Sequence, residues 1–323
     1  MPKTTPETIR EIGGYIELDT YSGRMLHEGA VALNCGRSCL AYLIEAKQIK
    51  KLLLPYFMCD SVLQLCEKYH VQMRFYHIGR DLLPVGAVPA ADEWLYVMNY
   101  YGQLPEGYPA QLKAQYGRVI ADYAQAYFLP PEAGVDTLYT CRKFFGVADG
   151  AFLYTDCAPA RAYGTDESFD RMRFLLGRYE RTASEFYAEY SANNHRFAEA
   201  PVLYMSRLTA NLLHAVDYDA VKRRRTENFA QYHAALGAVN QLSLRETEGA
   251  FAYPLLVENG AELRAALQQK KIYIPTLWPN VVHDNPADST EYDMAKNILP
   301  LPCDQRYGAE EIAYVTAQIM AGA

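Results

Sequence analysis

Short apolar runs alternate with amphipathic stretches along the first half of the chain. An apolar run of roughly four to eight residues is typical of a buried strand, and apolar residues spaced three to four apart are typical of a covering helix. This alternation predicts an α/β fold with a mostly parallel sheet sandwiched by helices. Strands are predicted at residues 51–57, 71–78, 93–101, 117–122, 138–140 and 151–155, and helices at 36–48 and 60–69, the latter with Asp60 as N-cap.

The pattern changes after residue 166, where helical spacing dominates before strands return. We therefore expect a large domain at residues 1–210 and a smaller C-terminal α+β domain at residues 211–323. The predicted helices are 166–196, 201–216, 217–236, 261–271 and one from residue 309, and the predicted strands are 252–258, 272–277 and 298–303.

The charge and the apolar content restrict the partners of the protein. A net charge of −7 argues against non-specific nucleic-acid binding, which needs a surplus of Lys and Arg. The basic run at 222–225 is expected to be a solvated helix face. The longest apolar run, 52–59, is far shorter than the ~20 residues of a membrane helix. The N-terminal residues carry charge where a signal peptide is apolar, so we expect a cytoplasmic protein that binds no membrane.

The cysteines and histidines suggest neither a disulfide framework nor a metal site. The seven cysteines are odd in number and include no Cys-x-x-Cys pair, which suits a reducing compartment. The seven histidines include no pair three or four residues apart, so their spacing does not indicate zinc.

Asp122 ends the apolar strand predicted at 117–122. In a parallel sheet this position lies at the carboxyl edge, where α/β folds bind ligands. A carboxylate there needs a cationic or proton-donating partner. Gln125 follows three residues later, within reach of the same place if the chain turns. An isolated Asp in this position is also consistent with a helix N-cap or a salt bridge.

Lys143 lies in an aromatic segment with Arg142 beside it. Desolvation and a neighbouring cation both lower the pKa of a lysine, and a neutral amine is what Schiff-base chemistry requires. Thr140 adds a hydroxyl suitable for a phosphate oxygen. Taken alone, Lys143 is better explained as a lysine that extends to the surface.

The segment Asn34-Cys35-Gly36-Arg37-Ser38 precedes a predicted helix. Free N–H groups and the helix dipole make such an N-terminus suitable for phosphate. The segment matches neither the P-loop nor the dinucleotide fingerprint, and the chain contains no Gly-x-Ser-x-Gly. Three common classes of α/β enzyme are thereby excluded.

The order of these groups resembles fold-type-I pyridoxal-phosphate enzymes, and more narrowly the DegT/DnrJ/StrS-type family of sugar aminotransferases. That family has a Gly-containing turn at its first helix, an Asp-x-x-Gln or Asp-x-x-His motif, and a lysine ahead of a Gly-Gly turn. The corresponding segments here are Gly36-Arg37-Ser38, Asp122-Tyr-Ala-Gln125, and Lys143, 21 residues after Asp122. The likeness extends to KRRRTENFAQYHAAL, YIPTLWP and NILPLPCDQRYGAEEIAYVTAQI, and so covers most of the chain.

The resemblance implies pyridoxal phosphate as the cofactor and a homodimer as the assembly. It assigns to Lys143 the Schiff base and the proton transfer at the substrate's α-carbon. Asp122 is implied to keep the ring nitrogen protonated, and Gln125 to contact the phenolic oxygen. The implied phosphate ligands are Gly36, Arg37, Ser38 and Thr140, and Cys59 falls at the position that stacks on the ring.

Some positions depart from the family pattern and make this an atypical, short member. Cys59 is not aromatic, and Arg37 replaces the usual Thr, which strengthens a phosphate contact through charge. Asn193 and Asn194 are the candidates for the Asn that a partner subunit usually supplies.

The resemblance implies an aminotransferase that moves an amino group from a donor such as glutamate to a keto group, possibly of a sugar. Its partners are then small molecules, and no metal is expected. Two alternatives stay open: a non-catalytic or regulatory protein that keeps the fold, and a pyridoxal-phosphate enzyme of another reaction type, such as a dehydratase.

Overall fold

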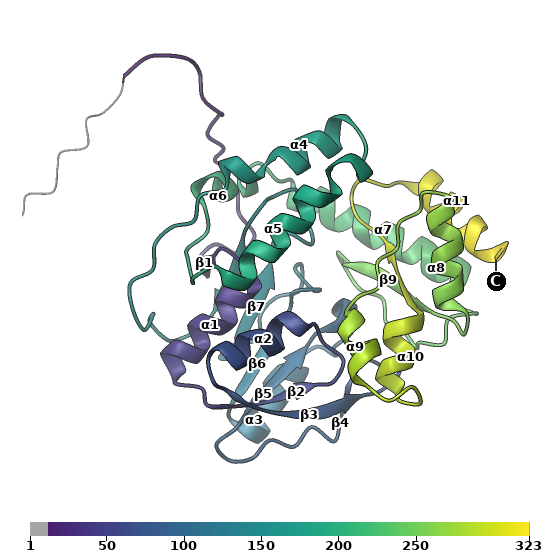
Figure 1. Ribbon diagram of the computed structural model, residues 1–323, viewed down its shortest axis with the longest axis horizontal. Coiled ribbons are helices and arrows are strands. Elements are labelled where there is room, and N and C mark those ends of the chain that lie inside the picture. The colour runs from purple at the N-terminus through teal and green to yellow at the C-terminus, as the bar shows by residue number, and fades with distance from the viewer. Residues whose placement is uncertain (1–11, 323) are drawn as a thin grey trace, which may run out of the picture.

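The computed structural model describes residues 12–322. Most of the charged N-terminal segment and the first residues of the predicted large domain lie outside this range. The described chain contains one large central sheet covered by helices and a smaller C-terminal unit, which lies to the right in Figure 1.

The central sheet has eight strands, and the predicted α/β class is confirmed. In spatial order they are β1 (Val31–Leu33), β8 (Ala151–Tyr154), β7 (Asp136–Thr140), β6 (Val119–Asp122), β5 (Trp94–Met98), β2 (Lys51–Pro55), β3 (Gln72–Ile78) and β4 (Pro84–Val85). All neighbouring pairs from β7 to β3 are parallel, whereas β8, β1 and β4 pair antiparallel with their neighbours. The sheet is therefore mostly parallel, and its parallel strands end at one common edge.

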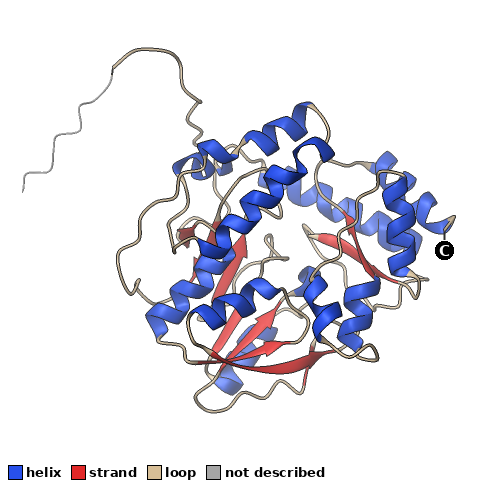
Figure 2. Ribbon diagram, in the orientation of Figure 1, coloured by secondary structure: helices blue, strands red, loops and turns tan. Residues whose placement is uncertain are grey.

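Alternate residues of the strands point into two different apolar clusters, one on each face of the sheet. In β5, Leu95 and Val97 belong to one cluster and Tyr96 to the other. The cluster around Tyr96 contains the buried side of α1 (Gly36–Lys47) and Val62 of α2 (Asp60–Lys68). The opposite cluster contains residues of α3 (Tyr108–Tyr116) and α6 (Arg207–Leu213). Helices thus cover both faces, as the distribution of helices around the strands in Figure 2 shows.

The C-terminal unit is built on a two-stranded antiparallel sheet of β9 (Ala252–Leu256) and β10 (Ile298–Pro302). Three helices bury their apolar sides against it in a third cluster: α7 (Tyr218–Leu236), α8 (Gly260–Gln269) and α11 (Ala309–Met320). This confirms a smaller α+β part. The boundary at residue 210 stays a prediction, since Ala252 and Leu256 also join the core of the large part.

The helical region predicted at 166–196 is not one helix. It divides into η2 (Phe169–Arg171), α4 (Arg173–Glu180), η3 (Ser184–Phe186) and α5 (Tyr187–Glu199). The break follows from local polar groups: the hydroxyl of Thr182 donates to Glu185 at 2.9 Å and competes with helical bonding. Phe186 then packs against Gly177, where any Cβ would collide with its ring. The turn brings α5 back alongside α4 (Figure 1).

The prediction of a strand at 272–277 is wrong. This segment pairs with no strand among the described residues, and Pro275 within it has no N–H to donate. Two helices that the sequence analysis did not predict follow it, α9 (Pro279–Asp284) and α10 (Thr290–Asn297). The prediction of Asp60 as an N-cap is also wrong, because Cys59 is the N-cap and the Asp60 side chain instead accepts from Gln64 at 3.1 Å.

The basic run at 222–225 was expected to be a solvated helix face, and for Arg225 that is wrong. Arg223 and Arg224 are exposed on α7, but Arg225 is 1% exposed. Its guanidinium donates to the carbonyls of Ala250 and Phe144 at 3.0 and 3.1 Å. Consecutive helical residues lie about 100° apart, so a run of four spreads around most of α7, and Arg225 falls on the side that packs against the rest of the chain.

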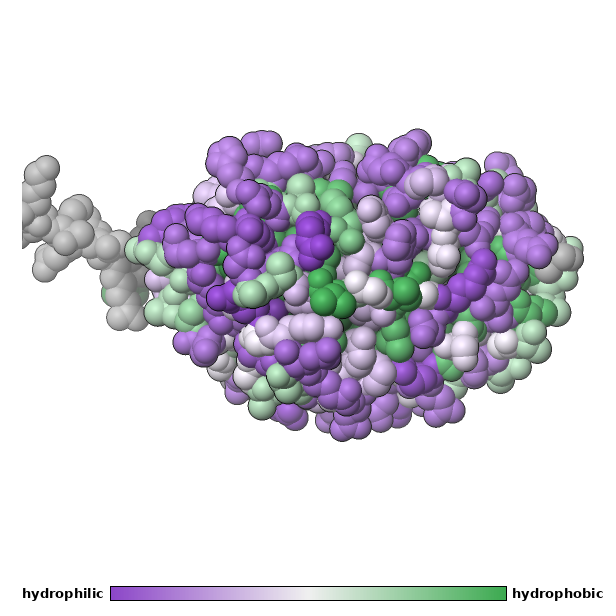
Figure 3. Space-filling view, turned by 90° about the horizontal axis from the view of Figure 1, so that it is seen from below, coloured by the Kyte–Doolittle hydropathy of each residue, from purple (hydrophilic) through white to green (hydrophobic). Residues whose placement is uncertain are grey.

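Among residues 12–322, no helix combines the length and the apolar character needed to cross a membrane. On the face drawn in Figure 3, polar side chains predominate and apolar ones form small patches toward the centre.

His27 is buried among aromatic rings, and its protonation therefore depends on how these rings pack. Its Nε2 is 3.0 Å from the carbonyl of Tyr127, and its Nδ1 is 3.2 Å from the hydroxyl of Tyr154. A neutral ring satisfies both, with Nε2–H donating and Nδ1 accepting. Burial lowers the pKa of His27 from 6.5 to about 4.

Between these two pKa values the folded state binds fewer protons than the unfolded chain. The free energy of unfolding that comes from the neutral His27 is therefore fully present above pH 6.5 and is lost as the pH falls toward 4. We expect His27 to contribute about 3 kcal/mol of this loss. Denaturant unfolding of the wild type and His27→Gln across this range measures it. Parallel stability curves for the two proteins would contradict the assignment.

Candidate functional site

Asp122 is the last residue of β6 and is buried at the carboxyl edge of the parallel strands. The hydroxyl of Tyr96 donates to its Oδ2 at 2.6 Å, and the backbone N–H of Ala124 donates to its Oδ1 at 2.7 Å. Burial raises the pKa of Asp122, while the charge of Lys143 and the bond from Tyr96 act in the opposite direction. The carboxylate is therefore held in place by two donors and faces a cation.

Lys143 lies in the turn that follows β7. The turn is fixed at both ends, since the N–H of Cys141 donates to the carbonyl of Gly150 and the carbonyl of Phe144 accepts from Arg225 and Gln305. Burial of the amine among surrounding groups lowers the pKa of Lys143, Arg142 adds to this, and Asp122 opposes it. The Lys143 residue as a whole is exposed to solvent, so its amine is open to a ligand.

Gln125 is 1% exposed and lies beside the same edge. Its Oε1 accepts from the N–H of Tyr101 at 2.9 Å, and Tyr101 has a φ of 52°, in the left-handed region. Such a backbone is strained for a tyrosine and persists because neighbouring groups hold it. The Nε2 of Gln125 is buried without a hydrogen-bond partner in the described chain. A buried donor without an acceptor is costly and indicates a missing partner.

Cys59 is the N-cap of α2 and is half-buried. Its Sγ lies 2.9 Å from the hydroxyl oxygen of Ser61, and its proximity to Lys143 influences the pKa of that amine. The position expected to face the cofactor ring is therefore next to Lys143, but it presents sulfur instead of an aromatic ring.

The residues expected at the phosphate lie at the start of α1 and the end of β7. Gly36 is the first residue of α1, and a Cβ added there would meet only Leu138 at 3.9 Å. The N-cap, Cys35, makes no side-chain capping bond, and the first turn carries no acidic residue. The hydroxyl of Ser38 donates its one proton to Oδ1 of Asn34 at 2.6 Å, so the donor that Ser38 can offer a phosphate in this arrangement is its backbone N–H. Thr140 is the buried last residue of β7.

Asn193 and Asn194, the two candidates for a residue supplied by a partner subunit, form bonds within their own chain. The Nδ2 of Asn193 donates to the carbonyl of Ala148 at 2.8 Å. The Oδ1 of Asn194 accepts from Nη1 of Arg142 at 2.7 Å. Both lie on α5, which therefore packs beside the loop that contains Lys143.

Two neighbours of the site were missed by the sequence analysis. Tyr96, which donates to Asp122, lies 26 residues earlier on β5 and has no local signal that marks it. Phe251 comes from the C-terminal unit, and its ring centroid is 5.5 Å from Nζ of Lys143. Only the pairing of β5 with β6 and the docking of the C-terminal unit bring these rings to the site.

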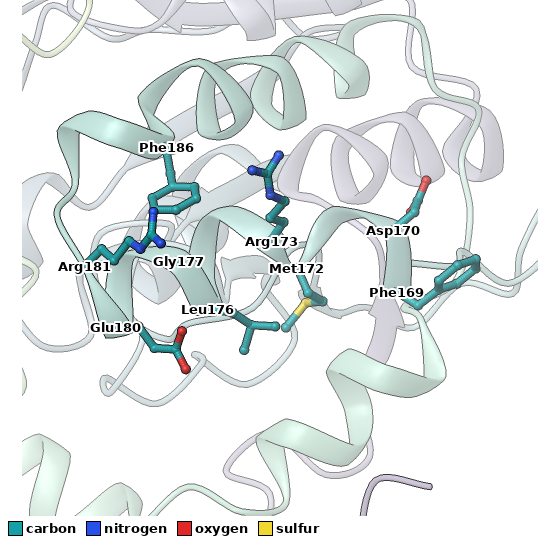
Figure 4. A pocket seen from close by; sticks show the side chains of 9 residues that line it. All are labelled: Phe169, Asp170, Met172, Arg173, Leu176, Gly177, Glu180, Arg181 and Phe186. Atoms are coloured by element: carbon teal, nitrogen blue, oxygen red, sulfur yellow. The ribbon is translucent and has the colours of Figure 1, made fainter. Parts of the chain in front are cut away.

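The surface pocket in Figure 4 lies apart from these residues. It has a volume of about 450 Å³ and is lined by residues of η2, α4 and η3, including Phe169, Leu176 and Phe186. Its two arginines are already paired, Arg173 with Glu189 and Arg181 with Glu185. A second pocket, of about 280 Å³, is lined by Arg37 and Ser38 together with residues of α2 and α5. Within residues 12–322 no group of three or more His, Cys, Asp or Glu side chains could hold a metal ion.

Together these residues bring a lysine, a carboxylate and a helix start to the carboxyl edge of an α/β sheet. A lysine with a lowered pKa and a buried carboxylate face each other, beside a helix start without a cap. The architecture is an α/β fold with a mostly parallel sheet between helices and a smaller C-terminal α+β part.

Comparison with solved structures supports this fold assignment. The chain is similar to the sugar aminotransferase CalS13 from Micromonospora echinospora, with 16% identity, 91% of this chain and 87% of that chain covered, and a TM-score of 0.61. It is similar to a DegT DnrJ EryC1 StrS aminotransferase from Brucella abortus, with 14% identity, coverage of 91% and 86%, and a TM-score of 0.60. A protein from Streptococcus pneumoniae, solved in its PMP form, matches with 13% identity, coverage of 90% and 87%, and a TM-score of 0.62.

No protein-family model matches the sequence, and no curated protein sequence matches it significantly. The chain therefore shares the fold of these aminotransferases at a low level of sequence identity.

Proposed function

We propose that this protein is a pyridoxal-phosphate-dependent aminotransferase of the DegT/DnrJ/StrS type. The observation that carries the proposal is the pairing of Lys143 with Asp122, each close enough to shift the pKa of the other at the carboxyl edge of the sheet. The fold supports it, since the similar structures include sugar aminotransferases. A protein of the same fold has been solved in both a PLP form and a PMP form.

The residues present fit the cofactor. Lys143 would hold it covalently through Nζ, and Asp122 would face the ring nitrogen. The Nε2 of Gln125, buried without a partner, would donate to the phenolic oxygen. The phosphate would lie against Gly36, Arg37, Ser38 and Thr140, and Cys59 would contact the ring.

When bound, pyridoxal phosphate withdraws electrons from the carbon next to the substrate's nitrogen. The chain's own groups supply the rest. The anionic Asp122, oriented by Tyr96 and Ala124, stabilises a positive charge at the atom that it faces. Lys143, with its pKa lowered, is neutral in a larger fraction of molecules near neutral pH, and its Nζ can accept and return a proton. The amino donor would be a compound such as glutamate and the acceptor a keto compound, possibly a sugar.

We further propose that the protein acts as a homodimer in the cytoplasm, and that residues 211–323 form its smaller domain. All seven cysteines are free, which supports a reducing compartment. The mass of the purified protein in solution tests the assembly, and a monomer would contradict it.

The cofactor assignment is tested by adding pyridoxal phosphate to the purified protein. We expect a yellow colour that borohydride bleaches, and a change of the visible spectrum when glutamate is added. A protein that stays colourless refutes the cofactor. A yellow protein that responds to no amino donor refutes transamination and favours a regulatory role or another reaction type.

A further inference from the structure

Arg142, next to Lys143, lacks a counter-ion. None of the ion pairs formed within residues 12–322 includes its guanidinium. Its Nη1 donates to Asn194, and its guanidinium carbon lies 4.5 Å from the ring centroid of Phe197, but its Nε is buried without a hydrogen-bond partner. Arg142 is half-buried, and a buried Nε without an acceptor is costly, so this arrangement indicates an anion that belongs beside it.

The carboxylate that acts on Arg142, that of Asp149, already has other partners. Asp149 is close enough to affect the pKa of Arg142, but its Oδ2 accepts from the N–H of Ser206, and its Oδ1 accepts from the hydroxyls of Ser206 and Thr209. It holds the start of α6 and cannot also neutralise the guanidinium fully.

A second cation and a helix N-terminus lie on the same side. Burial lowers the pKa of Arg142, and among the charges that act on it, Arg37 lowers it further while Cys35 raises it. Arg37 is in the first turn of α1 and Cys35 is its uncapped N-cap. Two guanidinium groups therefore lie near the positive end of a twelve-residue helix that carries no acidic side chain in its first turn.

We propose that Arg142, together with Arg37, binds the phosphate of the cofactor and supplies most of the protein's discrimination between phosphorylated and unphosphorylated pyridoxal. This rests on the proposed function and adds a residue to its site. A phosphate dianion neutralises the charges of the two arginines. It also accepts hydrogen bonds from the unpartnered Nε of Arg142 and from the free N–H groups at the start of α1.

The competing explanation is that Arg142 is structural and only holds α5 against the Lys143 loop through Asn194 and Phe197. The two explanations differ in what happens to a cofactor analogue without a phosphate. A structural arginine affects both compounds alike, whereas a phosphate ligand affects only the phosphorylated one.

The test is an absorbance titration of the purified protein with pyridoxal phosphate and with pyridoxal. The proteins are the wild type, Arg142→Gln, Arg142→Lys, and Arg173→Gln as the control, since Arg173 is an exposed arginine on neighbouring α4. We expect Arg142→Gln to weaken the binding of pyridoxal phosphate by about 10- to 100-fold, with pyridoxal unchanged. Arg142→Lys should recover part of the loss, and Arg173→Gln should match the wild type.

An equal loss for both compounds, or no loss for either, overturns the proposal while leaving the cofactor assignment intact. A wild type that binds neither compound overturns the proposed function itself, so the two failures are distinguishable. Thermal unfolding with inorganic phosphate is an independent readout. Phosphate should raise the melting temperature of the wild type more than that of Arg142→Gln, and an equal rise contradicts the assignment.

Discussion

The Lys143→Ala variant is expected to lose the visible absorbance that pyridoxal phosphate gives with the wild type. Alanine removes the amine whose charge acts on Asp122 and whose own pKa is raised by Asp122. After borohydride treatment of the wild type, mass spectrometry should find the cofactor on the peptide that contains Lys143, and on no peptide of the variant. We expect the glutamate-dependent spectral change to disappear completely.

The matched control is Lys50→Ala, which removes an exposed lysine between α1 and β2. It should keep the colour, the labelled Lys143 peptide and the response to glutamate. If Lys143→Ala still carries the borohydride-fixed cofactor on another lysine, the assignment of Lys143 is wrong even though the cofactor itself is right.

The Asp122→Asn variant is expected to bind the cofactor and to react slowly. Asparagine keeps the size of the side chain and an oxygen that can accept from Ala124, but it removes the negative charge. The loss of one oriented electrostatic group should slow the glutamate-dependent spectral change on the order of 10²- to 10³-fold. Rapid-mixing absorbance measures this rate directly.

The same substitution has a second consequence, at the amine. Asp122 raises the pKa of Lys143, so its removal lowers that pKa further, and spectral changes that depend on the protonation of Lys143 should move to lower pH. Tyr96→Phe, which removes only the 2.6 Å bond to the carboxylate, should give a smaller effect in the same assay. Asp92→Asn, at an exposed aspartate paired with Lys51, is the control and should change neither rate nor pH profile. A wild-type rate in Asp122→Asn would show that the carboxylate does not act on the reacting group.

Much of the fold was predictable because parallel strands are buried on both faces and so appear as continuous apolar runs. The strands that became β2, β5, β6 and β7 were predicted in this way, and β3 was predicted as well although several of its side chains are exposed. Short strands such as β1 and β4 left no comparable run, and α3, with Gln and Lys on most of its surface, has little apolar periodicity. The segment at 272–277 had an apolar pattern, but a strand also needs a partner, and the fold provides none there.

Some residues of the candidate site were also predictable from the sequence, and others were not. The order and spacing of Asp122, Gln125 and Lys143 allowed them to be proposed, because Asp122 ends a recognisable strand and the other two follow strands. The group that orients Asp122 lies 26 residues away and the bond from Arg142 spans 52 residues, so neither could be read from a local pattern.

The sequence by itself determined the alternation of strands and helices, the position of the acid at a strand end, and the chemical groups available beside it. These depend on apolar spacing and on residue types, which are local. Only the tertiary structure decided that Arg225 is buried, that Gln125 has an unpartnered donor, and that Arg142 lies near Arg37 without a carboxylate to neutralise it. Burial and Coulomb interactions depend on groups that are distant along the chain, and only folding brings those groups together.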